Sequence, residues 1–596
     1  MHFSVPSPSV VGLTFFTLCA VYYLGSLARN IRKAQKIGLP YTVNPTSVWV
    51  VVDSLLFTSR LFCYIVDNWL PPSIADNLNA SASFQRWKVK DRLVRRLGGC
   101  YVTVRPFSIT VDVSDADVIH QITSNRFQFP KPLRQYAVLL MYGPNIVATD
   151  GKEWLRHRHH ASPAFNEKNN LLVWREAISQ TLGMLEEWRK FAGAGKDSFV
   201  VKLPRTYIHK LILQVLASAA FGVVLPYTVT SEEAGPDRTR STFADHAEPP
   251  PGFRSTFRSV TEFMSQNFTS IFFAVSLMPR WVPRFLVPFL KPHFEAYEDL
   301  EKYLTCLLQA AKENNSNDQE SNNLTRLLVK SNEDATKETY RLSAKELIGN
   351  MHVFTFAGFE TTANALRFTL VLLALHPEKQ KWMRQGIKEA LQGQPEDPRE
   401  WQYTEVYPKL VAPLCVMMET LRLFAPVVSV PKSTGSSPSS IVVDGKPYIL
   451  PLNTDINLNC DVAHHRRDYW GPDAFSFVPE RWDARNTESF LAKNEGLSGL
   501  VAPGLEYNTL HKPIRGSYLP FSDGYRACLG KKFAQVEFVA ALAVIFRDYE
   551  VTPAKVSPGE SDEEAMKRAL KILNNTVSIL TLGMVDDAPL CFRRVK

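Results

Sequence analysis

Ten residues near the C-terminus place one cysteine among residues that suit a bound metal cofactor: Phe521-Ser-Asp-Gly524-Tyr-Arg526-Ala-Cys528-Leu-Gly530. Gly524 and Gly530 allow the backbone to turn tightly and to approach a large flat ligand without Cβ clashes. Backbone N–H groups can then point at the sulfur of Cys528, and Arg526 can pair with an anionic group of the ligand. The pattern predicts a metal-bound thiolate. The alternative is a buried structural cysteine in a glycine-containing loop.

A second candidate lies inside a long helical pattern, where the chain reads Ala357-Gly-Phe-Glu360-Thr361-Thr362. Adjacent threonines and a glycine are poor helix formers, so their presence in mid-helix needs a reason. Their hydroxyls can bond back to the preceding turn and open the helix slightly. The alternative is that Gly and Thr only allow close helix packing.

Two further pairs combine cations with a carboxylate or an aromatic ring. Glu419 and Arg422 stand at i and i+3 on one predicted helix face, and Arg481 follows in a proline-containing loop. Trp154 and Arg158 lie one helical turn apart, an arrangement that suits an anionic ligand through indole N–H and guanidinium. Each pair alone is common surface patterning.

Together these motifs, over residues 154–530, resemble in type and order those of the cytochrome P-450 superfamily. The resemblance implies haem b (iron-protoporphyrin IX) as cofactor. Cys528 would be the axial ligand of the haem iron, where a thiolate favours O–O cleavage. The cofactor-binding residues would be Trp154 and Arg158, as propionate partners, with Phe521, Gly524, Arg526 and Gly530 of the cysteine loop.

The same resemblance implies roles for the other motif residues. Thr361 and Glu360 would be catalytic, delivering protons on the distal side of the haem. Glu419, Arg422 and Arg481 would form a buried structural network. One departure is Lys432, where many family members carry an arginine that binds a propionate; a lysine supplies the charge but not the bidentate fork. We expect little from Lys432 or His465 as haem contacts.

Helical patterning predominates, for example over 174–191, 343–375 and 409–424, and short β-rich runs occur at 100–104, 108–113, 440–443 and 577–582. The expected fold class is mainly α with small β-sheets (α+β), the cytochrome P-450 fold, in a single catalytic domain. Two polar interruptions, 228–251 and 312–323, are expected to be surface loops.

The N-terminal region predicts membrane attachment. Residues 10–28 carry no charge and Arg29, Arg32 and Lys33 follow at once, which predicts a single-pass transmembrane anchor with the rest of the chain in the cytosol, at the endoplasmic reticulum. Residues 48–66 contain charges, so they either lie on the membrane, pack against the domain or cross a second time. A third membrane-contact candidate is 274–291, with a buried connector as its alternative. We expect an anchor at 1–28, a basic linker with the second apolar segment at 29–84, and the catalytic domain at 85–596.

The 596 residues are 45% hydrophobic and 21% charged with a net charge of +9, which excludes a disordered chain. Positive charge favours anionic partners, and basic residues at 156–160, 531 and 532 could face an acidic electron donor. The basic residues are dispersed and no nucleic-acid motif accompanies them, so no nucleic-acid partner is expected. Scattered cysteines indicate a reducing compartment, in which the sequons stay unused.

The resemblance implies a monooxygenase that takes electrons from an NADPH-dependent flavoprotein reductase and inserts one oxygen atom from O2 into a C–H or C=C bond. The segment Ala-Thr-Asp-Gly-Lys-Glu-Trp and the long loops resemble those of fungal members, which often act in secondary metabolism. Residues expected near the substrate are nearly all apolar, so a lipophilic terpenoid or polyketide is favoured: 139–141, Phe354, Phe356, 427–430 and 577–580.

Two other functions remain open. A haem-thiolate isomerase or dehydratase would rearrange a peroxide without O2 or reductase, but it would need no proton relay at Glu360 and Thr361. A non-catalytic haem carrier or sensor has no sequence feature in its favour.

Overall fold

The structure is a computed structural model, and it describes residues 8–44, 59–81, 85–190, 192, 197–227, 242–243, 248–278, 287–313, 323–337, 340–484, 500–501, 510–578 and 580–595. Most of the predicted second apolar segment, the middle of the 274–291 segment and most of both predicted surface loops lie outside these residues.

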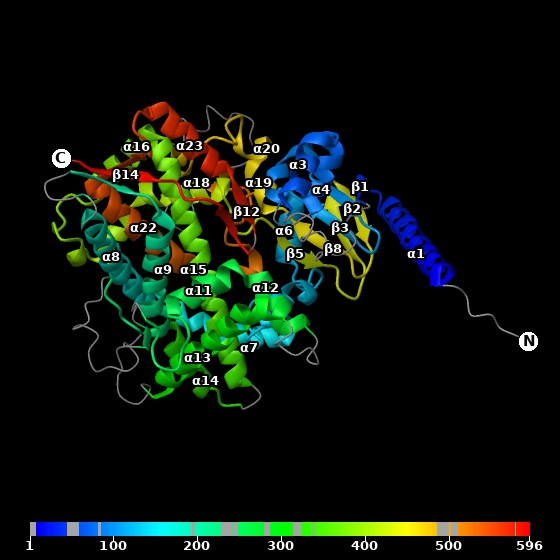
Figure 1. Cartoon of the computed structure of the whole chain (residues 1–596), viewed down its shortest axis with the longest axis horizontal. Coiled ribbons are helices and arrows are strands. Elements are labelled where there is room, and N and C mark those ends of the chain that lie inside the picture. The colour runs from blue at the N-terminus through cyan, green and yellow to red at the C-terminus, as the bar shows by residue number, and fades with distance from the viewer. Residues whose placement is uncertain are drawn as a thin grey trace, which may run out of the picture.

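Helices make up most of the described chain, as predicted (Figure 1). They are α1 (Pro8–Ile37), α3 (Arg60–Trp69), α4 (Pro72–Ser81), α5 (Arg92–Leu97), α6 (Ala116–Ser124), α7 (Gly151–Ala161), α8 (Glu167–Lys190), α9 (Pro204–Phe221), α11 (Phe257–Gln266), α12 (Phe268–Phe272), α13 (Lys291–Glu313), α14 (Leu324–Glu333), α15 (Ala344–Leu375), α16 (Pro377–Ala390), α17 (Tyr403–Val406), α18 (Val411–Leu423), α19 (Cys460–His465), α20 (Arg467–Trp470), α22 (Lys531–Asp548) and α23 (Asp562–Asn574).

The strands form small sheets beside the helices. The largest has the order β1-β2-β3-β8-β5, a second has the order β11-β14-β4, and the pairs β6-β7, β9-β10 and β12-β13 are antiparallel. The strands are β1 (Tyr41–Val43), β2 (Cys100–Val104), β3 (Ile109–Val113), β4 (Ser198–Val201), β5 (Val430–Ser433), β6 (Ser439–Val443), β7 (Lys446–Leu450), β8 (Asp455–Leu458), β9 (Leu500–Val501), β10 (Lys512–Pro513), β11 (Tyr549–Pro553), β12 (Thr576–Ser578), β13 (Leu582–Met584) and β14 (Leu590–Arg594). The predicted class, mainly α with small sheets, is confirmed.

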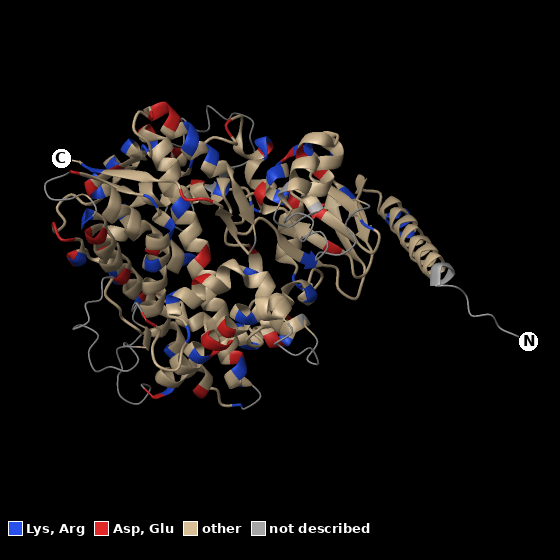
Figure 2. Cartoon of the chain, in the orientation of Figure 1, with Lys and Arg blue, Asp and Glu red and all other residues tan. Residues whose placement is uncertain are grey.

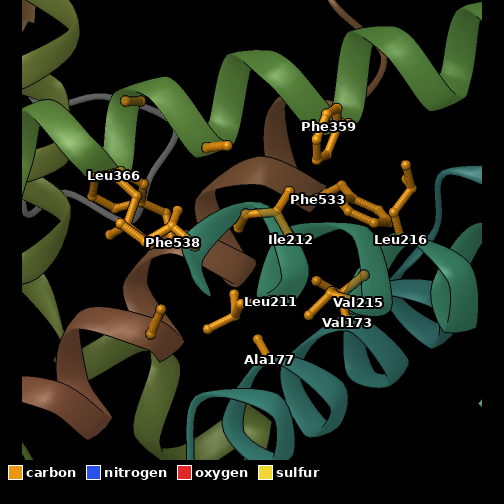
Figure 3. Close-up of a cluster of buried hydrophobic side chains, with 14 of the residues drawn as sticks. Val173, Ala177, Leu211, Ile212, Val215, Leu216, Phe359, Leu366, Phe533 and Phe538 are labelled. Atoms are coloured by element: carbon orange, nitrogen blue, oxygen red, sulfur yellow. The ribbon is translucent and has the colours of Figure 1, made fainter. Parts of the chain in front are cut away.

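Three helices, α8, α9 and α22, build the core together with the long helix α15. Helix α22 packs on α8, α8 on α9, and α9 on α15. Figure 3 shows apolar side chains gathered between these helices, among them Phe359 and Leu366 of α15 and Phe533 and Phe538 of α22. α15 begins at a capping box in which Ser343 and Glu346 satisfy each other's backbone N–H groups. This packing holds α15 and the segment before α22 in a fixed relation.

The predicted transmembrane anchor at 10–28 is not supported: within the described part of the chain, no helix is long and apolar enough to cross a membrane. These residues belong to α1, which extends away from the body in Figure 1. Figure 2 shows this helix uncharged over most of its length, while charges of both signs cover the body.

The segment predicted as a linker, 29–84, contributes to the body of the protein. β1 pairs in parallel with β2, and Ala34 and Ile37 at the end of α1 are buried in the apolar cluster that covers this sheet. Parallel pairing and apolar burial therefore join residues 34–43 to the sheet of the catalytic domain.

One predicted β-rich run is divided in a way that matters for the site. The run 577–582 contributes to both β12 and β13, which pair as a hairpin with Ser578 opposite Leu582. Leu582 N–H donates to the carbonyl of Pro426 at 2.8 Å, so the turn of the hairpin lies beside the chain that follows α18.

Candidate functional site

The Cys528 loop runs directly into α22. A hydrogen bond of 2.9 Å from Cys528 N–H to the carbonyl of Phe521 closes it. Gly524 adopts a φ of +66°, and a Cβ there would lie 2.4 Å from the carbonyl oxygen of Thr123, so this position requires glycine. A Cβ at Gly530 would make only ordinary contacts, 3.8 Å from Cys528 Sγ and Phe165 Cε1. Contacts within the protein therefore do not explain why a glycine occupies position 530.

The side chain of Cys528 is exposed, although many protein atoms lie near it. Burial raises the pKa of its thiol, and a backbone hydrogen bond from Gly530 and the charge of Lys531 oppose that rise. A side chain that faces a ligand site inside a protein has such an exposed surface. This geometry contradicts the alternative of a packed structural cysteine.

The Ala357–Thr362 segment lies in the middle of α15, whose helical structure continues unbroken through it. The Thr361 hydroxyl donates to the carbonyl of Ala357 at 2.6 Å, the back-bond expected from the sequence. A Cβ at Gly358 would lie 3.0 Å from Leu216 on α9. Gly358 thus serves close helix packing, the role given by the alternative interpretation, whereas Ala357 is exposed in the middle of a mostly buried helix.

Glu360 is the perturbed acid of this segment. Burial raises the pKa of its carboxyl to about 7, against hydrogen bonds from Thr581 and Ser265 that favour the charged form. Its Oε2 is buried and has no hydrogen-bond partner in the described chain. Thr581 comes from the β12–β13 turn and also accepts a hydrogen bond of 3.0 Å from Asn364. A carboxyl with a pKa near 7 can both hold and release a proton at neutral pH.

Cations gather around the buried ring of Trp154 on α7. The guanidinium carbons of Arg526, Arg126 and Arg158 lie 4.0, 5.2 and 5.6 Å from its centroid. Arg526 also pairs with Asp150 and donates to the carbonyl of Thr149 at 2.9 Å. Among the described residues, Arg158 has no carboxylate partner. The cluster therefore carries more positive than negative charge.

Two lysines extend this cluster, Lys432, which is buried, and Lys131, which is half-buried. Burial, together with the charge of Arg526, lowers the pKa of Lys131 to about 7 and that of Lys432 to about 8. Lys131 donates to the carbonyl of Val147 at 2.7 Å. Asp150 is the one carboxylate that acts on all three of these cations. A buried group of cations short of counter-charge fits a ligand carrying two carboxylates.

Phe165 connects the cysteine loop with α15. Its Cε1 approaches the Gly530 position, and its ring lies edge-on to that of Phe354 at 5.6 Å. An accessible cysteine, an accessible Ala357 on the opposing helix and a cationic group to one side fit a flat, dianionic cofactor ligated by Cys528. The residues present therefore fit haem.

The structure brings Glu419, Arg422 and Arg481 together as a buried network. Glu419 accepts 2.8 Å hydrogen bonds from Arg422 on both oxygens, and a 3.0 Å bond from Arg481. Trp482 Nε1 and Val478 N–H complete its shell, each at 2.9 Å. Although burial opposes the charge, Arg422 and Arg481 hold the pKa of Glu419 at about 2. The network fixes the 474–482 segment against α18.

The basic face expected at 156–160 is wrong in its composition. His157 and His160 are fully buried, and Arg156 pairs with Glu346. Only His159 of these residues is exposed, because Arg156 and His157 contact α15 and His160 contacts Ser331 of α14.

Glu153, His157 and Glu346 place ligand atoms within 4.8 Å of one another, as a metal site could. Asn350 argues against that use. Its amide donates to the Glu346 carbonyl and to His157 Nδ1, and its oxygen accepts from Ile146 N–H, so its orientation is fixed. His157 Nδ1 is then an acceptor, and Nε2 carries the hydrogen that points toward Glu346 Oε1 at 3.5 Å. A metal ion at this site would need His157 Nε2 without a hydrogen.

His465 lies away from the cationic group. Its Nδ1 donates to the Asp461 carbonyl at 2.7 Å, and its ring stacks on Phe475. Lys432, by contrast, lies close enough to Arg526 and Asp150 to belong to the group. Four residues that sequence reasoning missed, Lys131, Asp150, Ser265 and Thr581, come from separate segments. No local motif marks them, and only folding brings them to the site.

Comparisons with known proteins agree with this geometry. The cytochrome P450 family model matches residues 82–579. A cytochrome P450 monooxygenase of Postia placenta is 31% identical over 83% of this chain and 84% of its own length. Another, of Arthrobotrys oligospora, is 26% identical over 97% of this chain and 96% of its own. The crystal structure of the cytochrome P450 CYP102L1 shares the fold at a TM-score of 0.61 and 20% identity, covering 86% of this chain and 98% of that one.

Proposed function

Because this chain belongs to the cytochrome P450 family and is a monooxygenase, we propose that it inserts one oxygen atom from O2 into a C–H or C=C bond of a lipophilic molecule. We propose further that its electrons come from NADPH through a flavoprotein reductase. Haem bound through a cysteine thiolate supplies the oxygen-activating chemistry of this family. The protein supplies binding, orientation and proton handling.

Cofactor binding is assigned to two groups of residues. Cys528 ligates the iron, and the loop from Phe521 to Gly530 places backbone close to the haem. Trp154, Arg158 and Arg526 bind the propionates, with Lys131 and Lys432 as additional partners. Support comes from the cations around Trp154, for which Asp150 is a single counter-charge within the described chain.

Proton handling is assigned to Glu360 and Thr361. The single observation that carries the monooxygenase reaction is Glu360, a buried carboxyl with a pKa of about 7 next to the Thr361 hydroxyl. At neutral pH it can release a proton to Thr361 and regain one. An isomerase or dehydratase that rearranges a peroxide has no use for such an acid.

The class of substrate is inferred from the residues on α15 and in the chain after α18, which are apolar. Phe354, Phe356 and Val428 are buried and would exclude water, and Val427 is partly exposed beside them. Such a lining favours a terpenoid or polyketide in a secondary-metabolite pathway, in keeping with fungal relatives.

Membrane association is assigned to exposed apolar side chains of α1 and α3. On α1, Phe15 and Phe16 are 65% and 73% exposed, and on α3, Leu61 and Trp69 are 69% and 75% exposed. Aromatic and aliphatic side chains at this exposure suit a lipid interface, with the catalytic domain facing the cytosol at the endoplasmic reticulum.

Flotation of the full chain with phosphatidylcholine vesicles tests the membrane assignment. The Phe15→Asp/Phe16→Asp variant should lose flotation, whereas Phe127→Asp, which alters a body residue that is 83% exposed, should keep it. Equal flotation of both variants would remove α1 from the assignment.

Turnover with two oxidant systems tests the reaction. A spectral screen of the haem-loaded protein against lipophilic compounds first identifies a ligand that displaces water from the iron. That ligand is then incubated either with reductase, NADPH and O2 or with a hydroperoxide alone. We expect an oxygenated product in the first system. Rearrangement of the hydroperoxide, with no product in the first system, would establish the isomerase alternative.

A further inference from the structure

A second cavity lies apart from the Cys528 loop and the cations around Trp154. It is partly open, has a volume of about 470 Å³ and is formed where α15, α18, α23 and the 475–478 segment meet Trp87. This volume is within the range of small-molecule sites, roughly 300–1,000 Å³. Its apolar lining comes mainly from Trp87, Leu372, Phe424, Phe475, Phe477 and Leu573. We refer to it as the Trp87 pocket.

Lys90 gives the Trp87 pocket a positive charge without a counter-ion. Its Nζ lies 4.8 Å from the centroid of Trp87 and 5.7 Å from that of Phe475. No carboxylate of the described residues is within ion-pair distance of it. Its backbone has a φ of +48°, a conformation that non-glycine residues rarely adopt. The chain thus holds Lys90 over two aromatic rings at the pocket.

The other lysine of the lining has a partner, since Lys379 pairs with Glu480 at 3.0 Å. The one carboxylate of the lining, Glu378, is 62% exposed and lies 3.5 Å from His376 Nδ1. Lys90 is therefore the lining cation without an ion-pair partner among the described residues, and it favours a ligand of negative charge.

The wall of the Trp87 pocket is rigidly held. The carbonyl of Ser476 accepts a 3.0 Å bond from Arg422, and Val478 N–H donates to Glu419 at 2.9 Å. A preformed wall loses little conformational entropy when a ligand binds.

We propose that the Trp87 pocket is a second ligand site, which binds an amphipathic carboxylate. The apolar chain lies against Phe424, Phe475 and Leu573, and the carboxylate pairs with Lys90 above the Trp87 ring. This site is separate from the haem site, and the proposal does not rest on the proposed reaction.

Photolabelling of the haem-loaded full chain with a diazirine derivative of dodecanoic acid tests this site. Label should appear on the peptides that contain Trp87 to Lys90 and Phe475 to Val478. Unlabelled dodecanoate should compete, and dodecanol should compete less. Lys90→Gln should weaken labelling about three- to fivefold, the size expected for a half-exposed ion pair, and Lys88→Gln, a change at an exposed neighbour, should not.

A second variant tests the same pocket in case the Lys90→Gln protein does not fold. Ser476→Trp places a bulky ring on an exposed lining residue and should abolish labelling of both peptides, with the carbon monoxide spectrum of the haem unchanged. Label confined to peptides that do not line the Trp87 pocket, or equal labelling of the Lys90→Gln and Lys88→Gln proteins, would overturn the proposal. Neither result bears on turnover, which is measured separately.

Discussion

At the scale of single residues, the proposed chemistry depends on two neighbours on α15. Thr361 lies near the middle of the helix, and burial raises the pKa of Glu360, the residue before it, to about 7. Thr361 can pass a proton inward because its hydroxyl both donates and accepts. Glu360 can replace that proton.

Thr361→Ala should uncouple electron consumption from product formation. Loss of a positioned proton donor typically lowers a rate about 10²- to 10⁴-fold, so product per NADPH should fall strongly while NADPH oxidation continues. Thr355→Ala is the matched control, because Thr355 makes the same back-bond, to the Met351 carbonyl at 2.9 Å, one and a half turns earlier. Equal coupling in both variants would exclude the proton role of Thr361.

Residues that lie together in the sequence are the ones that sequence reasoning can find. Cys528, Gly524 and Arg526 are within one loop, and Glu360 adjoins Thr361. Lys131, Ser265 and Thr581 are each more than 100 residues apart in the sequence. Only the packing between helices and strands brings them close to the site. The burial of Lys432 beside Arg526 could not be predicted from the sequence, because it depends on the fold and not on the residue type.

At the scale of elements, the β12–β13 hairpin tunes the acid on α15. Thr581 at its turn hydrogen-bonds Glu360 in the charged form and so lowers the pKa of that carboxyl. The sequence does not predict this contact, because nothing in the β-rich run 577–582 marks the turn between β12 and β13.

Thr581→Val should raise the pKa of Glu360 further, since the bond that stabilises its charged form is lost. Glu360 then stays protonated to higher pH, and the pH dependence of product per NADPH should move upward. Thr576→Val changes the same residue type at the far end of the hairpin, where the hydroxyl has no partner among the described residues, and should leave the profile in place. A downward shift in Thr581→Val would contradict the assignment.

The Glu419 network joins α18 to the segment that covers it. Glu419→Gln would leave Arg422 and Arg481 as buried charges with one fewer counter-charge, at a cost of about 3–5 kcal/mol in the free energy of unfolding. Urea denaturation measures this loss. Glu563→Gln is the control, because Glu563 and Lys567 form an ion pair with side chains 77% and 72% exposed, for which less than about 1 kcal/mol is expected. Similar losses in both would show that the network is not buried in solution.

Long helices were well predicted from sequence, and short strands less so. The 343–375 prediction matches α15 and its Ser343 cap, because an apolar pattern over many turns and a capping box agree. The 174–191 prediction begins seven residues later than α8, whose first turns have buried asparagines that hide the apolar period.

At the scale of the whole molecule, buried histidines set the response to acid. His352 is fully buried against Tyr142 and Phe356, and neither ring nitrogen has a partner in the described chain. Burial lowers the pKa of His352 to about 3 and that of His157 to about 4. The folded state therefore binds fewer protons than the unfolded state between pH 6.5 and these values.

Stability should fall as pH drops below about 6.5, the pKa of an unfolded histidine. For His352 the loss reaches about 2 kcal/mol at pH 5, at 1.36 kcal/mol per pH unit. His352→Phe should remove that part of the loss, as measured by urea denaturation at pH 7 and pH 5. His159→Gln, at an exposed position, should not. A His352→Phe protein with an unchanged pH dependence would refute the assignment.

The central claim is that Cys528 is the thiolate ligand of a haem, and a carbon monoxide difference spectrum of the reduced full chain tests it most directly. We expect the wild type and a Cys306→Ser control to show the band of a thiolate-ligated haem. Cys528→Ser should lose this band. A thiolate band that persists in Cys528→Ser, or that is missing from a haem-loaded wild type, would contradict the account.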